Sequence, residues 1–115
     1  SVGLSLIDDT GYPQNLTWIN QVKNTGKPVI AIMLSSKPLL VTDYIDGFDA
    51  FVMAFLPGTE GAGISDVLYG DYNFVGKLPY TYPLNASQAA DTMLNPNYNP
   101  EDYLFPYGYG LTYSN

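Results

Sequence analysis

The stretch AFVMAFLPGTEGAGISDVLYG, residues 50–70, runs from an apolar segment through a glycine-rich turn into a helical pattern. Residues 50–56 are all apolar and end at a Pro-Gly pair, which is typical of a strand buried on both faces in a parallel sheet. Apolar residues then recur at helical spacing over 64–68, with Thr59 as a candidate N-cap and Gly70 as a candidate stop. The stretch therefore predicts a strand, a tight turn and a helix in succession.

The upstream sequence predicts a helix and a second strand. Apolar residues at helical spacing indicate a helix over about residues 14–25, which Gly26 would end. Residues 29–34 (VIAIML) form another continuous apolar run of strand length. Residues 39–41 (LLV) fit either a short continuation of that strand or a capping turn. The order helix, strand, strand, helix predicts an α/β fold with a mostly parallel sheet and flanking helices.

The composition changes after Gly70. Eight of the eleven Tyr and five of the nine Pro lie beyond this position. We expect an irregular, Tyr- and Pro-rich C-terminal segment that wraps a small α/β core. Because no internal repeat or low-complexity linker is found, residues 1–115 are predicted to form one domain or a piece of one.

The overall composition excludes several classes of protein. The 115 residues are 46% hydrophobic, which is typical of a folded chain, and carry a net charge of -7 with only four Lys and no Arg. Nucleic-acid binding needs a basic patch, so it is not expected. The lack of Cys and His removes most transition-metal sites and any histidine acid or base, and no apolar run is long enough to cross a bilayer. Ser1 in place of an initiator Met predicts a processed or truncated product.

A phosphate-binding loop is the first candidate site. In GAGISD, residues 61–66, Asp66 stands where a dinucleotide fingerprint needs its third glycine. In GDYNFVGKL, residues 70–78, the spacing is one residue too long for a P-loop and Leu78 replaces the required Ser or Thr. Glu60 would also repel an anion at the start of the helix. We interpret the glycines as a strand-to-helix turn.

Carboxylates are the second candidate site. A pair about 5 to 5.5 Å apart could carry out retaining glycoside hydrolysis. The acids considered are Asp8, Asp9, Asp43, Asp46, Asp49, Glu60, Asp66 and Asp71. Spacing alone places no two of them together, and the cluster over 43–49 lacks an apolar surrounding that would raise a pKa. A solvated acidic loop is the favoured interpretation there.

The aromatic tail is the third candidate site. In YLFPYGYGLTY, residues 103–113, large side chains occupy every second position: Tyr103, Phe105, Tyr107, Tyr109, Leu111 and Tyr113. The pattern predicts an extended segment with one aromatic face. That face could stack on sugar rings, or it could pack against the sheet and fasten the end of the chain. Pro106 and Gly108 are expected to bend the segment, so packing is the favoured interpretation. Asn15 and Asn85 also begin glycosylation sequons, which matter only in a secreted eukaryotic protein.

Three motifs in order resemble the C-terminal part of family 3 glycoside hydrolases, the β-glucosidase and exo-β-glucanase family. PVIAIMLSSKPLLV, residues 28–41, resembles the family's strand and Ser-Gly-Arg-Pro segment. DAFVMAFLPGTEGAGISDVLYGDYNFVGKLPYTYP, residues 49–83, resembles its Pro-Gly-x-Glu-Gly turn, following helix and Gly-Lys-Leu-Pro hairpin. YLFPYGYGLTYS, residues 103–114, is similar to its closing Phe-Pro-Phe-Gly-x-Gly-Leu-Ser-Tyr signature. The match spans nearly the whole chain.

The resemblance implies the later half of a flavodoxin-like α/β sandwich that follows a barrel-type domain, with the active site at their interface. It implies retaining removal of terminal glucosyl or related units from glucosides or β-glucans. The family's nucleophilic Asp lies in the first domain and its acid/base Glu just ahead of the segment that Ser1 begins. We therefore expect no catalytic, cofactor-binding or metal-binding residue in this chain and no cofactor. Glu60 is assigned to packing.

The resemblance also implies partners and a location. The remainder of the same enzyme and a β-glucoside or β-glucan are the expected partners, with no nucleic acid and no membrane. A secreted or periplasmic location is expected, with a cytoplasmic one left open. Ser36 and Lys37 depart from the family's Gly and Arg, and Lys lacks the planar fork of Arg. A half-domain should also expose an apolar sheet edge or face, which predicts association with a partner.

Two alternatives remain open at this stage. The first is a carbohydrate-binding or structural module without catalysis, which would use the tail aromatics. The second is a free-standing flavodoxin-like regulator, which is weaker because only two strand and helix pairs are evident where such sheets have about five strands.

Overall fold

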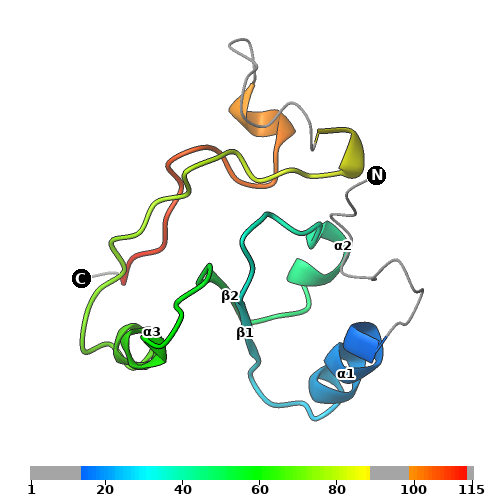
Figure 1. Ribbon diagram of the computed structural model, residues 1–115. Coiled ribbons are helices and arrows are strands. Elements are labelled where there is room, and N and C mark those ends of the chain that lie inside the picture. The colour runs from blue at the N-terminus through cyan, green and yellow to red at the C-terminus, as the bar shows by residue number, and fades with distance from the viewer. Residues whose placement is uncertain (1–13, 89–98, 114–115) are drawn as a thin grey trace. The chain divides into compact units, whose positions relative to one another are not determined.

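The computed structural model describes residues 14–88 and 99–113 (Figure 1). The chain divides into two compact units, Ser1–Phe55 and Leu56–Asn115. Asp8, Asp9 and Ser1 lie outside the described residues.

The first unit contains helix α1 (Gln14–Lys23), strand β1 (Ile30–Met33), helix α2 (Thr42–Ile45) and strand β2 (Ala50–Met53). The two strands pair in parallel, with Ile30 opposite Ala50 and Met33 opposite Met53. Helix, strand and strand therefore occur in the predicted order, and the predicted parallel pairing is confirmed. Both strands are shorter than the apolar runs that predicted them.

The expected burial of the strands on both faces is wrong for one face of β1. Ile30, Ile32 and Leu34 occupy alternate positions, so they share one face, and they are 54%, 41% and 59% exposed. Val52 of β2, in contrast, is buried. Val52 lies on the same face as its register partner Ile32, so the exposure is confined to β1. Within the described part of the chain β1 pairs with β2 alone, and its other edge leaves these side chains open to solvent.

The two helices of the first unit also refine the predictions. α1 ends at Lys23, and Thr25 and Gly26 form a turn in which the Gly26 N–H donates to the Lys23 carbonyl over 3.3 Å. The left-handed φ of 69° at Gly26 explains the glycine there. Val41 occupies the N-cap position of α2 without a side-chain capping bond, whereas Leu40 lies in a β-bridge, so residues 39–41 combine features of the two predicted alternatives. The predicted acidic loop after it therefore begins as a short helix.

The second unit is built from helix α3 (Gly61–Leu68), two 3-10 turns, η1 (Ala86–Gln88) and η2 (Pro100–Asp102), and two extended segments. The predicted Thr59 cap is wrong, because Glu60 occupies the N-cap position and makes no side-chain capping bond. The predicted stop at Gly70 is confirmed. Its φ is 85°, and the N–H groups of Gly70 and Asp71 donate to the carbonyls of Val67 and Asp66, which is a Schellman motif.

The extended segments of the second unit run side by side in antiparallel directions (Figure 1). The Leu78 N–H donates to the Tyr109 carbonyl over 2.8 Å, and the Tyr82 N–H donates to the Phe105 carbonyl over 2.7 Å. Tyr80, Thr81, Tyr82 and Pro83 are buried along this pairing. These four residues of the Tyr- and Pro-rich segment are therefore among the most buried of the described residues.

Candidate functional site

Four aromatic side chains form a continuous row in the second unit. Tyr80 and Tyr82 come from one extended segment, with ring centroids 6.4 Å apart. The Tyr82 ring meets Phe105 edge-on at 6.1 Å, and Phe105 stacks on Tyr109 at 4.7 Å with 29° between the planes. Tyr82 is 1% exposed and Tyr109 is 41% exposed. The row thus connects the interior of the unit to its surface, and aromatic contacts of this kind stabilise beyond their area burial.

The predicted period of two in the tail does not persist in the structure. The Tyr109 N–H donates to the Pro106 carbonyl over 3.1 Å, and Gly108 has a φ of 78°, so residues 106–109 form a turn. Because the turn reverses the backbone, Phe105 and Tyr109 meet each other, whereas Tyr107 lies at the tip and is 67% exposed. The prediction of one continuous aromatic face is wrong.

The end of the tail is fastened within its own unit. The Tyr113 hydroxyl donates to the carbonyls of Val67 and Leu68 at the end of α3, the latter over 3.1 Å. The Tyr113 N–H donates to Oδ1 of Asn73 over 2.9 Å, and its ring packs on Phe74 at 5.3 Å between centroids. The favoured interpretation of the tail, that it fastens the end of the chain, is confirmed for Tyr113.

Burial perturbs one titrating group of the row. The Tyr80 side chain is 8% exposed, and burial raises the pKa of its hydroxyl above the ordinary value of about 10. The neutral hydroxyl is therefore the form that the folded unit prefers. This residue belongs to packing, since it lies in the interior half of the row.

The predicted carboxylates are scattered over the two units. Asp43, Asp46 and Asp49 are exposed, as are Glu60 and Asp71, whereas Asp66 is half-buried. Asp49 has a structural task, because its Oδ2 accepts a 2.7 Å hydrogen bond from the Val29 N–H at the start of β1. Among residues 14–88 and 99–113, no three acidic side chains are arranged to hold a metal ion.

The other predicted positions are also on the surface. Glu60 is exposed at the N-cap of α3, beside a turn in which its N–H donates to the Pro57 carbonyl. Lys37 is exposed, and Ser35 closes the loop before it through bonds between its Oγ and the Lys37 backbone. Asn85 is exposed, with its Oδ1 accepting from the Ser87 N–H and Oγ. Asn15 lies in α1, where its side chain is outside the described residues.

Sequence reasoning missed the role of residues 76–82 in holding the tail. A Cβ at Gly110 would lie 2.4 Å from the Gly76 carbonyl oxygen, so the two segments approach as closely as a glycine permits. The alternation of Tyr80 and Tyr82 in LPYTYP was a signal of an extended segment with one buried face. Its partner could not be identified from the pattern.

Residues 7–113 match the profile described as "Glycosyl hydrolase family 3 C-terminal domain". The chain is 35% identical to the periplasmic beta-glucosidase of Salmonella typhimurium (strain LT2), with 84% of this chain and 15% of the relative covered. It is 38% identical to the xylan 1,4-beta-xylosidase of Xylanibacter ruminicola, with 84% and 12% covered.

A solved structure with a similar fold is that of a mutant of the exo-1,3/1,4-beta-glucanase ExoP from a Pseudoalteromonas species. The TM-score is 0.79 at 39% identity, and the match covers 96% of this chain and 18% of the glucanase. This chain therefore spans less than a fifth of the length of these three proteins. Within the described residues, none of the helices has the length and apolar character needed to span a bilayer.

Proposed function

Since this chain belongs to glycosyl hydrolase family 3 as a C-terminal domain, we propose that it is part of a retaining β-glycosidase that removes terminal β-D-glucosyl or related residues. The relatives are named as a beta-glucosidase, a xylosidase and a glucanase, which supports a β-linked glycoside as the substrate. The alternative of a module without catalysis is less favoured, because these relatives are glycoside hydrolases.

In the proposed reaction, one carboxylate attacks the anomeric carbon while a second protonates the leaving oxygen, and the second then activates water to release the sugar. We propose that both carboxylates belong to parts of the enzyme outside this chain. The carboxylates of the described residues are dispersed and, apart from half-buried Asp66, exposed, which supports this division of labour. Residues 1–115 would then be one fragment of the sandwich domain, incomplete in catalysis on its own.

The match of residues 7–113 to the family profile carries the proposed reaction, and the exposed side chains of β1 support the proposal that residues 1–115 are only a part of the enzyme. Ile30, Ile32 and Leu34 expose about half of their surface each, and burying such a side chain fully contributes about 1.5–3 kcal/mol. Parallel sheets are found almost only with both faces covered. The remainder of the same enzyme is the proposed cover, since the chain spans less than a fifth of each of the three proteins compared.

A comparison of the full-length protein with residues 1–115 alone tests the proposal. The full-length protein is expected to hydrolyse an aryl β-glucoside or β-xyloside, with the β-anomer as the first product in a proton NMR time course. Residues 1–115 alone are expected to be inactive. Appreciable hydrolysis by residues 1–115, or the α-anomer as the first product, would refute it.

The similarity to a periplasmic relative supports a proposed secreted or periplasmic location.

A further inference from the structure

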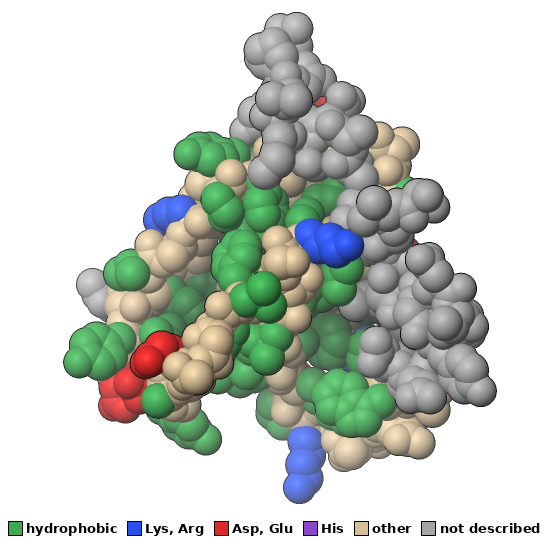
Figure 2. Space-filling view, viewed as in Figure 1, with side chains coloured by type: hydrophobic (Ala, Val, Ile, Leu, Met, Phe, Trp, Pro, Cys, Tyr) green, Lys and Arg blue, Asp and Glu red, His purple; other side chains and the backbone are tan. Residues whose placement is uncertain are grey.

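The chain contains few peptide bonds of the kind that trypsin-like proteases cleave. These proteases cut after Lys or Arg, whose charged side chain enters an acidic pocket of the protease. The 115 residues include four Lys and no Arg, so only four bonds qualify, those after Lys23, Lys27, Lys37 and Lys77. Lysine side chains, blue in Figure 2, reach the molecular surface. Burial alone therefore does not protect these bonds.

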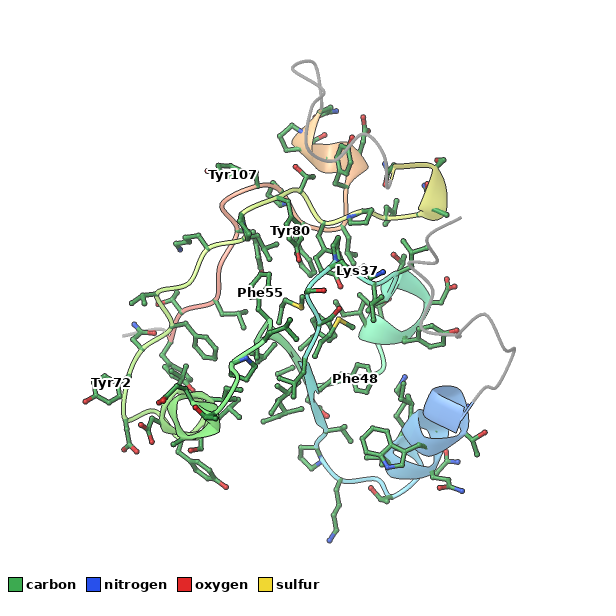
Figure 3. The ribbon with its side chains drawn as sticks, in the orientation of Figure 1. Lys37, Phe48, Phe55, Tyr72, Tyr80 and Tyr107 are labelled. Carbon is green, nitrogen blue, oxygen red and sulfur yellow. The ribbon has the colours of Figure 1, made fainter. Side chains whose placement is uncertain are left out.

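Proline follows two of the four lysines. Lys27 precedes Pro28, and Lys37 precedes Pro38. The proline ring replaces the N–H at the bond to be cut and crowds the leaving nitrogen, so trypsin-like proteases do not cleave Lys-Pro bonds. Both lysines are exposed, and Lys37 lies in the loop between β1 and α2 (Figure 3). These two exposed positions are protected by the residue that follows and not by the fold.

The Lys23 side chain is held within the first unit. Its Nζ donates to the Tyr44 carbonyl over 3.3 Å and lies 4.7 Å from the centroid of the Phe48 ring, which is labelled in Figure 3. The backbone at the bond to be cut is helical, since the Asn24 N–H donates to the Asn20 carbonyl over 3.0 Å. A protease binds its substrate as an extended strand. Cleavage after Lys23 therefore requires the end of α1 to unfold and the ammonium group to leave its contacts.

Lys77 is exposed, but the bond after it lies within the antiparallel pairing of the second unit. The Leu78 N–H donates to the Tyr109 carbonyl over 2.8 Å, and the Leu78 carbonyl accepts from the Gly108 N–H over 2.9 Å. These are the main-chain groups that a protease would need for its own hydrogen bonds to the substrate strand. Cleavage after Lys77 therefore requires the two segments to separate, which is a local unfolding of the unit.

We propose that the folded chain resists trypsin-like proteases, because each of its four lysines either precedes a proline or has its peptide bond held in hydrogen-bonded backbone. This inference goes beyond the proposed function and does not depend on it. It concerns the proteases that a protein meets in a secreted or periplasmic location. A protease can cut after Lys23 or Lys77 only while the backbone there is open, and such openings are rare in a stable fold.

Digestion of the native full-length protein with trypsin tests this inference, with the cuts inside residues 1–115 located by mass spectrometry. The unchanged protein is expected to show no cut after any of the four lysines. Pro38→Ala creates a cleavable bond in an exposed loop, so cutting after Lys37 is expected to become at least about tenfold faster. Pro57→Ala is the matched control, because it removes a proline from the loop between β2 and α3 without creating a bond after lysine. It is expected to remain uncut.

The heat-unfolded protein provides a second measurement that does not depend on the folding of a variant. Once unfolded, residues 1–115 are expected to be cut after Lys23 and Lys77 but not after Lys27 or Lys37. Cutting of the native unchanged protein after any lysine as fast as in Pro38→Ala would overturn the inference. Native Pro38→Ala that stays uncut would also overturn it, because something other than proline would then protect Lys37.

Discussion

Substitution of Gly110 by Ala tests the close pairing that organises the second unit. The added Cβ would lie 2.4 Å from the Gly76 carbonyl oxygen, whereas contacts of a Cβ atom below 3.0 Å essentially do not occur. The two backbones must therefore separate by at least 0.6 Å. Since the obstructing atom belongs to the backbone, a side-chain rotation cannot relieve the contact.

The magnitude follows from the neighbouring hydrogen bonds. The hydrogen bonds from Leu78 to Tyr109 and from Gly108 to Leu78 are 2.8 and 2.9 Å long. Separation of the backbones by at least 0.6 Å would stretch both to the longest donor–acceptor distances at which a hydrogen bond still forms. Each contributes about 0.5–1.5 kcal/mol. We expect Gly110→Ala to lower the free energy of unfolding by about 1–3 kcal/mol, the range found for overpacked sites.

Urea unfolding monitored by near-UV circular dichroism of tyrosine is a suitable assay, because Tyr80, Tyr82 and Tyr109 lie along the pairing. Gly63→Ala is the matched control. Gly63 lies within α3 with open space around its Cβ position, so alanine is expected to be neutral or to stabilise by up to about 1 kcal/mol. If Gly110→Ala unfolds at the same urea concentration as the unchanged protein, the close approach of the two segments is refuted.

Three further predictions concern single side chains. Tyr113→Phe should lower the free energy of unfolding by about 0.5–1.5 kcal/mol, because the Tyr113 hydroxyl donates to two carbonyls at the end of α3. The control Tyr72→Phe, at a residue that is 69% exposed, should change thermal unfolding little. Equal shifts of the melting temperature in the two variants would contradict this prediction. Asp49→Ala should destabilise the first unit by about 1 kcal/mol through loss of the bond to the backbone before β1, and exposed Asp46→Ala is the control in urea unfolding. Folding raises the pKa of the Tyr80 hydroxyl, so the stability that this group contributes is fully present below about pH 10 and is lost as the pH rises through the folded pKa. The pH midpoint of alkaline unfolding should therefore rise in Tyr80→Phe. An unchanged midpoint would show that this pKa does not limit stability.

Local patterns in the sequence were sufficient to place α1, β1, β2 and α3, but not the short helix α2. The apolar runs at 29–34 and 50–56 contain β1 and β2, and their type indicated the parallel pairing that the structure has. Gly70 marked the end of α3 because a left-handed backbone there requires glycine. These predictions succeeded because each depends on residues within one or two turns of the chain. The motifs also indicated the family that the comparisons show.

The candidate site was less accessible to prediction from the sequence. The period of two over 103–113 suggested one aromatic face, but the turn at 106–109 separates Tyr107 from the stacked rings of Phe105 and Tyr109. Pro106 and Gly108 indicated a bend in this segment, but the pattern could not show which rings the bend brings together, because that depends on the hydrogen bonds that the neighbouring residues make. In the same way, Thr59 has a side chain typical of an N-cap, but Glu60 occupies that position, so α3 begins one residue later than predicted.

The amino-acid sequence by itself determined the order of α1, β1, β2 and α3, the parallel type of the sheet and the family, since these follow from side-chain periodicity and turn residues close together in the chain. Only the tertiary structure decided that Tyr113 bonds to α3, 46 residues earlier, that Gly110 meets Gly76, and that one face of β1 is uncovered. Contacts between distant segments depend on the path of the whole chain, because the same apolar or aromatic side chain can satisfy many different partners. The pattern shows which side chains need a partner, and the fold determines which partner each one has.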